Sequence, residues 1–196
     1  MRILIFCNKL PYPQRDGSAI AIHNMIRGYW EAGAEVTVLA LNTHKHYYPP
    51  EAIPTEDALS QVRLRSVTTD TQVTFGGAFR NLLSGEPYHV SRFRQKPVEQ
   101  ELINLLTEQP FDIIQLEEIY LSTYTELIRT YSEATLVLRA HNVEHAIWQG
   151  VTEQTRNRLK KAYLRLQTNR LQAFEYRHLS DFDAILPIAE ADGARF

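Results

Sequence analysis

The sequence is poor in cysteine, in long hydrophobic runs and in net charge. Cys7 is the single cysteine among 196 residues, which excludes an internal disulfide and a zinc site built from cysteines; we expect a buried structural thiol. The 21 Lys and Arg residues nearly balance the 23 Asp and Glu residues, so overall charge does not indicate a nucleic-acid partner. No apolar window approaches transmembrane length and no signal-peptide pattern opens the chain, which predicts a cytoplasmic protein or one peripheral to the inner face of a membrane.

Three nucleotide and metal motifs are also missing. The first apolar run is not followed by G-x-G-x-x-G, and the second ends at Asn42 without an acidic residue, which argues against a dinucleotide oxidoreductase. The absence of a Gly-Lys-Ser/Thr sequence argues against an NTPase. His141 and His145 are four residues apart but lack the acidic partner of a metalloprotease site. We expect no metal and no cofactor, and a dinucleotide-binding protein with a degenerate turn stays the weakest alternative.

Apolar runs and helical patterns alternate along the chain. Continuous apolar runs are typical of strands buried on both faces, hence of a parallel sheet, and six occur, at residues 3–7, 35–41, 62–67, 111–116, 135–140 and 183–188. Helical patterns occupy residues 19–32, 75–83, 98–108, 121–131 and 153–179. This alternation predicts an α/β, Rossmann-like domain with a parallel central sheet and helices on both faces. Residues 189–196 resemble the opening of a helix, as if a domain had been cut from a longer protein.

The loop after the first strand combines two prolines, a glycine and two helix-capping residues. Pro11 and Pro13 restrict the backbone, Gly17 can adopt positive φ or let a ligand approach, and Asp16 or Ser18 can cap the next helix. Free N–H groups and the dipole at a helix start favour anions. Gly17 and Ser18 are therefore candidate phosphate contacts; an ordinary capped turn is an equal alternative.

Polar residues follow two further predicted strands. Glu117 and Glu118 come after the fourth strand, and His141 and Asn142 after the fifth. Ligands of open α/β sheets bind beyond the carboxyl ends of the strands. Either glutamate can hold acceptor hydroxyls or act as a base, and a solvated pair is the alternative. Asn142 is also a candidate N-cap for a helix over residues 143–148, and His141 a hydrogen-bonding partner of that helix.

Four segments resemble, in order and spacing, the N-terminal half of glycosyltransferase family 4 enzymes of the GT-B fold. They cover nearly the whole chain: residues 2–6 with Pro11-Tyr12-Pro13, Asp16-Gly17-Ser18 and Ile22-His23-Asn24; Glu86-Pro87-Tyr88-His89-Val90-Ser91-Arg92-Phe93; Arg139-Ala140-His141-Asn142-Val143-Glu144; and Phe174-Glu175-Tyr176 with residues 183–184 and 189–192. Two departures are Ser18, where many members have a second glycine, and Ala189, where serine is usual.

The resemblance implies a retaining, metal-independent hexosyltransferase-type enzyme that moves a sugar from a nucleotide-diphosphate sugar to a glycan or lipid-linked acceptor. Residues 1–196 would form its N-terminal, acceptor-side domain, without the C-terminal nucleotide-sugar-binding domain, so the isolated chain would be inactive. By this resemblance His141 would face the donor sugar and Gly17 and Ser18 the donor phosphate. The candidate acceptor-binding residues are Asp16, Glu117, Glu118 and Asn142. The alternative is a non-catalytic carbohydrate- or phosphate-binding module on the same fold.

Two basic stretches indicate possible surfaces. The first interleaves apolar and cationic residues in a pattern typical of docking on anionic lipid, with core packing as the alternative: Phe75, Phe79, Leu82, Leu83 and Phe93 with Arg80, Arg92, Arg94 and Lys96. The second lies along the long helix predicted at residues 153–179, where a solvated face is the default interpretation.

Overall fold

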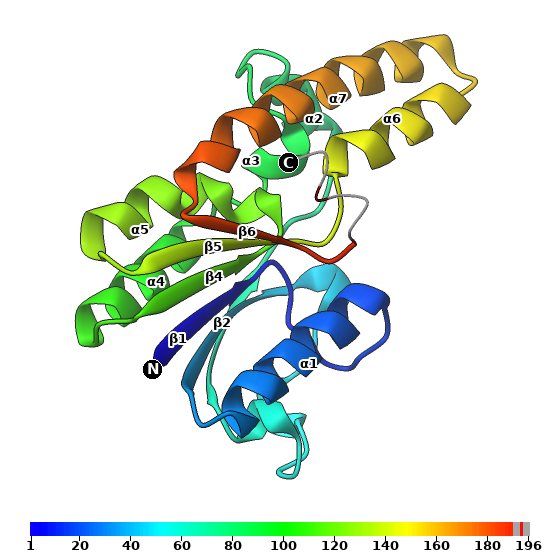
Figure 1. Ribbon diagram of the computed structural model, residues 1–196. Helices are drawn as coiled ribbons and strands as arrows, with labels where there is room; N and C mark the ends of the chain where they lie inside the picture. The colour runs from blue at the N-terminus through cyan, green and yellow to red at the C-terminus, as the bar shows by residue number, and fades with distance from the viewer. Residues whose placement is uncertain (190–192, 194–196) are drawn as a thin grey trace.

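The computed structural model describes residues 1–189 and 193 and contains one six-stranded sheet (Figure 1). The strands are β1 (Arg2–Cys7), β2 (Glu35–Thr43), β3 (Arg63–Thr69), β4 (Ile113–Glu117), β5 (Thr135–Ala140) and β6 (Ala184–Pro187). Their order is β3-β2-β1-β4-β5-β6, and every pairing is parallel. The predicted Rossmann-like α/β fold is therefore confirmed, because this is the strand order of a doubly wound sheet.

Helices cover both faces of the sheet. In Figure 1, α1 lies on one face, and α4 and α5 lie on the other. The helices are α1 (Gly17–Glu31), α2 (Phe75–Asn81), α3 (Tyr88–Ser91), α4 (Lys96–Glu108), α5 (Thr125–Tyr131), α6 (Glu144–Gln154) and α7 (Arg158–His178). Short 3₁₀ helices occupy His44–His46, Pro50–Ala52, Ala58–Ser60, Ile119–Tyr124 and Leu179–Asp181.

The central strand β1 shows why its apolar run is continuous. Ile3 and Ile5 pack in the cluster that includes Ile22 and Ile26 of α1, whereas Leu4 packs in the cluster on the other face with residues of α4 and α5. All of these side chains are fully buried. Successive strand residues point to opposite faces, so a strand covered on both sides needs apolar residues at every position. Cys7, at the end of β1, is buried as expected.

The helix predicted over residues 153–179 is wrong in its extent, because two helices occupy this region. α6 ends at Gln154, and α7 begins at Arg158 after the Asn157 side chain accepts a hydrogen bond from the Lys160 amide at 2.9 Å. A side-chain cap of this kind satisfies an orphan amide and starts a new helix. α6 and α7 pack side by side as a hairpin that projects beyond the sheet (Figure 1).

A buried glutamine of α7 anchors the segment that resembles the Pro-Tyr loop. The Gln167 side chain accepts a hydrogen bond from the Tyr88 amide at 2.7 Å and donates one to the Asn81 side chain at 3.0 Å. Arg170 donates to the carbonyls of Asn81 and Leu82 at 3.0 and 2.9 Å. α2 and α3 are therefore held against the α6–α7 hairpin rather than against the sheet alone.

The amphipathic pattern after residue 75 is divided between surface and core. Phe79 and Leu83 are 73% and 88% exposed, whereas Phe93 is buried in the core. The side chain of Phe75 and the helix expected within residues 189–196 lie outside the described residues, apart from Ala189 and Gly193. Within the described part of the chain, no helix is both long and apolar enough to span a bilayer.

Candidate functional site

The sheet brings the predicted polar residues to one edge. β1 and β4 are neighbours, with Cys7 opposite Glu117, and Glu117 lies opposite Arg139 of β5. Lys9, Glu118 and His141 directly follow these strand ends. In the order 3-2-1-4-5-6 the chain reverses its winding direction between β1 and β4, which is where doubly wound proteins bind ligands.

The proline loop delivers the start of α1 to this edge. Asp16 is the N-cap, because its Oδ1 accepts a hydrogen bond from the Ala19 amide at 2.9 Å. Lys9 reaches both Asp16 carboxylate oxygens at 2.7 and 2.8 Å. Burial opposes ionisation of Asp16, but the hydrogen bonds from Lys9 and Ala19 outweigh it and lower the pKa. Of the two expected capping residues, Asp16 and not Ser18 therefore caps α1.

Gly17 does not need positive φ, and that part of the expectation is wrong. Positive φ occurs at two other glycines, Gly33 and Gly85. Gly17 is the first residue of α1, it is exposed, and a Cβ atom placed on it meets nothing within 4 Å. The space around the Cβ position of Gly17 is therefore open, and free amides at a helix start can bind an anion.

His141 is held by a chain of buried hydrogen bonds. Its Nε2 lies 2.6 Å from Oε2 of Glu117, which also accepts from Arg139 at 3.2 Å. The other Glu117 oxygen accepts from Gln115 at 2.6 Å, and Gln115 accepts from the Tyr29 hydroxyl of α1 at 2.8 Å. The His141 side chain is 4% exposed and that of Glu117 fully buried. The network therefore fixes the ring's orientation from three elements of the fold.

Glu118 occupies an unusual position beside this ring. Its backbone φ is 96°, the only positive value at a non-glycine residue in the described part of the chain. Oε1 lies 3.8 Å from Nδ1 of His141, and the buried Oε2 has no hydrogen-bond partner among the described residues. Burial raises the pKa of Glu118 well above its usual value, and the nearby carboxylates of Glu144 and Glu117 raise it further. Strained backbone and an unpaired carboxyl together are typical of functional positions.

The interpretation of Glu117 and Glu118 as a solvated pair is wrong, because both side chains are buried. Tyr120 closes the region from the following turn and donates a short hydrogen bond to Glu144, the first residue of α6. Burial raises the pKa of both Tyr120 and Glu144. Several acidic groups are therefore gathered where water is largely excluded.

Asn142 is not the N-cap of α6, which corrects that expectation. Val143 holds the N-cap position without a side-chain hydrogen bond, and exposed Asn142 contacts Glu144 at 3.4 Å. Glu175 of α7 satisfies the helix start instead. Its carboxylate accepts from the amides of Glu144 and His145 at 3.0 and 2.8 Å, and it lies 2.6 Å from Nδ1 of His145.

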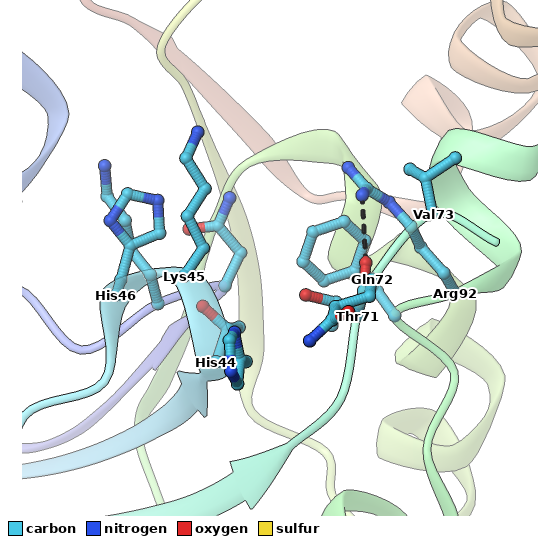
Figure 2. Close-up of a pocket in the computed structure, with 11 residues that line it drawn as sticks. His44, Lys45, His46, Thr71, Gln72, Val73 and Arg92 are labelled. Atoms are coloured by element: carbon cyan, nitrogen blue, oxygen red, sulfur yellow. Dashed lines mark hydrogen bonds between the residues drawn. The ribbon is translucent and has the colours of Figure 1, made fainter.

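An open pocket of about 460 Å³, which we call the basic pocket, adjoins the ends of β1, β2 and β3 (Figure 2). Its lining includes Lys9, His44, Lys45, His46, Thr71 and Arg92, and no Asp or Glu of the described residues contributes to it. Arg92 follows α3 and donates to the Thr71 carbonyl at 3.0 Å. Lys9 and His46 also line a small cavity with Asp16 and Pro13. The basic pocket thus shares two of its lining residues with the cavity at the proline loop.

Sequence reasoning missed Lys9, Arg139 and Glu175. Arg139 carried a signal, because a cation inside an otherwise apolar strand predicted to be buried requires a counter-charge. Glu175 lies in one of the segments that carry the family resemblance, but its contact was not predictable, since it acts on a helix about 30 residues earlier in the chain. Within residues 1–189 and 193, no three His, Cys, Asp or Glu side chains converge as metal ligands would.

Comparisons with known proteins show the fold. The chain matches sucrose-phosphate synthase from Thermosynechococcus elongatus with a TM-score of 0.61 and 11% identity, covering 100% of this chain and 45% of that protein. It matches Arabidopsis thaliana UGT89C1 complexed with UDP-L-rhamnose with a TM-score of 0.53 and 13% identity, covering 97% and 42%. The UDP complex of UGT89C1 also gives 0.53, at 12% identity over 100% and 47%. This chain therefore spans less than half the length of these structures. No family model and no curated protein matches the sequence.

Proposed function

We propose that the chain is the N-terminal, acceptor-side half of a two-domain, retaining glycosyltransferase of the family 4 type. The observation that supports this most strongly is the fold match over 97–100% of the chain to less than half of two larger proteins, one of which was solved both with UDP and with UDP-L-rhamnose. Of the residues that the sequence points to, Glu117, Glu118 and His141 come together at one edge of the sheet. The activity is transfer of a sugar from a nucleotide-diphosphate sugar to a glycan or lipid-linked acceptor, without a metal ion.

The start of α1 would receive the donor diphosphate. Charge develops on the departing diphosphate during transfer, and preorganised N–H donors stabilise such charge. Gly17 leaves the backbone accessible, and Ser18 continues the same helix start. Asp16 is occupied by the cap and by Lys9, so its role is to shape the loop rather than to bind a free acceptor hydroxyl.

His141 would form the polar wall next to the reacting sugar. Because Glu117 and Arg139 hold the ring in place, any contact that it makes with the donor costs little reorganisation. Glu118 is the group beside it with an unused carboxylate oxygen. We assign Glu117 to positioning and Glu118 to the acceptor side of the site. A lipid-linked acceptor would bring exposed Phe79 of α2, and exposed Leu83 just after it, toward a membrane surface.

Sugar transfer by the protein extended through its second domain tests the proposal. His141→Ala removes a contact to the reacting sugar, and Gly17→Val blocks the approach to the diphosphate. Each change lowers kcat/KM by about 10²-fold, the typical cost of removing one preorganised contact. The folded domain accommodates a side chain at residue 17, because no atom lies within 4 Å of its Cβ position.

Two matched controls accompany these variants. Gly28→Val places the same side chain on α1, again in open space, and His178→Ala removes a histidine at the end of α7, far along the chain from the site strands. Both should retain wild-type turnover. Wild-type transfer by a folded His141→Ala protein contradicts the role of that residue. Absence of transfer, together with micromolar carbohydrate or phosphate binding by this chain alone, favours a non-catalytic binding module instead.

A further inference from the structure

We propose that the basic pocket binds a phosphoryl group, and hence that the acceptor of the proposed transferase is phosphorylated. That the bound molecule is the acceptor rests on the proposed function, whereas the phosphoryl-binding site itself does not. The pocket gathers cations from three separate parts of the chain: Lys9 after β1, Lys45 after β2 and Arg92 after α3. Figure 2 shows Lys45 and Arg92 rising on opposite sides of the opening.

Two of the three cations of the pocket lack a counter-charge within the described part of the chain. Lys9 has Asp16 as its partner, but neither Lys45 nor Arg92 forms an ion pair with a described residue. An exposed lysine needs no partner, because water solvates it. Arg92 is half-buried, and a cation removed from water without a compensating anion is unfavourable. A bound anion would provide that compensation.

The geometry of Arg92 leaves donors free for such an anion. Nη1 donates to the Thr71 carbonyl at 3.0 Å and Nε donates to the His89 carbonyl at 3.3 Å. The guanidinium also lies 5.1 Å from the centre of the Phe93 ring. These contacts fix the plane of the group while Nη2 has no described partner, and a fixed guanidinium is well suited to phosphate oxygens.

Burial, and after it the neighbouring cations, lowers the pKa of His46 in the pocket and of His89 next to Arg92. Burial lowers the pKa of His46, and the charges of Lys9 and Lys45 lower it further. Burial and the charge of Arg92 lower the pKa of His89 to about 4. The permanently charged cations that line the pocket are Lys9, Lys45 and Arg92.

A phosphoryl group fits this set better than a single carboxylate. Its charge is close to two at neutral pH, which matches the two cations without a carboxylate partner. The position also fits an acceptor, because the pocket shares Lys9 and His46 with the cavity beneath the proline loop. A group anchored here lies beside the helix start proposed for the donor diphosphate.

Titration of this chain with inorganic phosphate, inorganic pyrophosphate and acetate tests the inference, followed by NMR of the His44 and His46 ring protons. Phosphate and pyrophosphate should shift these signals at millimolar concentration, and acetate should not. Lys45→Ala should weaken phosphate binding by about tenfold, the equivalent of one lost charge-assisted hydrogen bond. Lys160→Ala, which removes an exposed lysine from α7, makes the same charge change and should leave the affinity unaltered.

Arg92→Gln provides a second variant, checked for folding by circular dichroism because Arg92 also holds two carbonyls. It should abolish the shifts while the far-ultraviolet spectrum stays native. Equal binding of acetate, equal loss in Lys160→Ala, or no shift with either phosphate overturns the inference. Vesicles of phosphatidylcholine with and without phosphatidic acid distinguish a lipid headgroup from a soluble phosphate, and Lys45-dependent binding of either source supports it.

The two proposals fail separately. Phosphate binding is measured without any donor and without sugar transfer. If the extended protein transfers sugar but its basic pocket does not bind phosphate, the inference is wrong and the proposed function stands. If the pocket binds phosphate in a Lys45-dependent manner but no sugar transfer occurs, the proposed function is wrong and the phosphoryl site stands.

Discussion

The two halves of the carboxyl edge of the sheet differ in exposure and in the side chains that they gather, cations in one and carboxyl groups with His141 in the other. Beyond β1, β2 and β3 lies the basic pocket, which is open and contains exposed Lys45. At the ends of β4 and β5 lie Glu117, Glu118 and His141, which are buried. The boundary between the two regions lies between the neighbouring strands β1 and β4.

This difference in exposure suits the two halves to different tasks, the binding of a ligand and the positioning of a side chain. A cation that is to meet a ligand must remain accessible, as Lys45 does, because the anion has to reach it. A group that must hold a fixed orientation gains from burial and from many partners, as Glu117 does through Gln115, Arg139 and His141. The same sheet edge therefore supplies an open anion site and a rigid polar wall side by side.

Glu175→Ala should destabilise the buried half of the sheet edge, at the ends of β4 and β5, and should produce the largest effect on stability. The buried carboxylate satisfies two amides at the start of α6 and pairs with His145. Removing it leaves buried donors without partners, which costs about 3 kcal/mol in the free energy of unfolding. Urea denaturation measures the loss.

Two further variants make this result interpretable. Glu175→Gln keeps an acceptor oxygen and should recover part of the stability. Asn142→Ala, at the residue that sequence reasoning placed in the capping role, should change stability by less than about 0.5 kcal/mol because Asn142 is exposed and makes one weak contact. Equal losses in Glu175→Ala and Asn142→Ala contradict the assignment of the cap to Glu175.

Glu118→Gln should stabilise the protein, in contrast to Glu175→Ala. The pKa of Glu118 is raised in the folded state by burial, Glu144 and Glu117, with Lys9 opposing. The folded protein therefore holds this proton more tightly than the unfolded chain, and stability falls as pH rises from about 4.3 through the raised pKa. Glutamine removes that loss, so the unfolding midpoint should rise by about 2–4 °C at pH 8, the equivalent of about 1 kcal/mol.

The pH dependence gives the decisive readout for this variant. The difference between wild type and Glu118→Gln should be smallest near pH 4, where the carboxyl is protonated in both states, and should grow to a plateau at higher pH. A lower midpoint for Glu118→Gln at pH 8 contradicts the prediction, because it indicates an ionised and paired carboxylate. In the extended protein the same variant should slow transfer, which is the usual cost of stabilising a functional position.

Much of the fold was predictable, because burial on both faces leaves a direct mark on the sequence. The six apolar runs correspond to β1 to β6, with boundaries shifted by a few residues. The division of the predicted 153–179 helix was not predictable, since residues 155–157 contain neither proline nor glycine and the break depends on the Asn157 side chain. The short helix at Ile119–Tyr124 likewise follows the positive φ of Glu118.

The position of the candidate site could be predicted from the sequence, but the burial of its side chains could not. Strand ends located Glu117, Glu118 and His141 at one edge, yet whether the glutamates meet water depends on Tyr120 and on helices later in the chain. Local patterns carry no such information. The basic pocket has the same origin, because its three cations come from loops up to 83 positions apart, from Lys9 to Arg92.

Lys45→Ala should sharpen the comparison by having almost no effect on stability. Lys45 is exposed and forms no ion pair with a described residue, whereas Glu117 at the end of β4 is buried and is paired with Arg139 and His141. Substitutions at such surface positions usually change the free energy of unfolding by less than about 0.5 kcal/mol. Urea denaturation of Lys45→Ala beside Glu175→Ala measures the contrast directly. A loss above about 1 kcal/mol would mean that Lys45 supports the fold, and its effect on phosphate affinity would then no longer separate binding from structure.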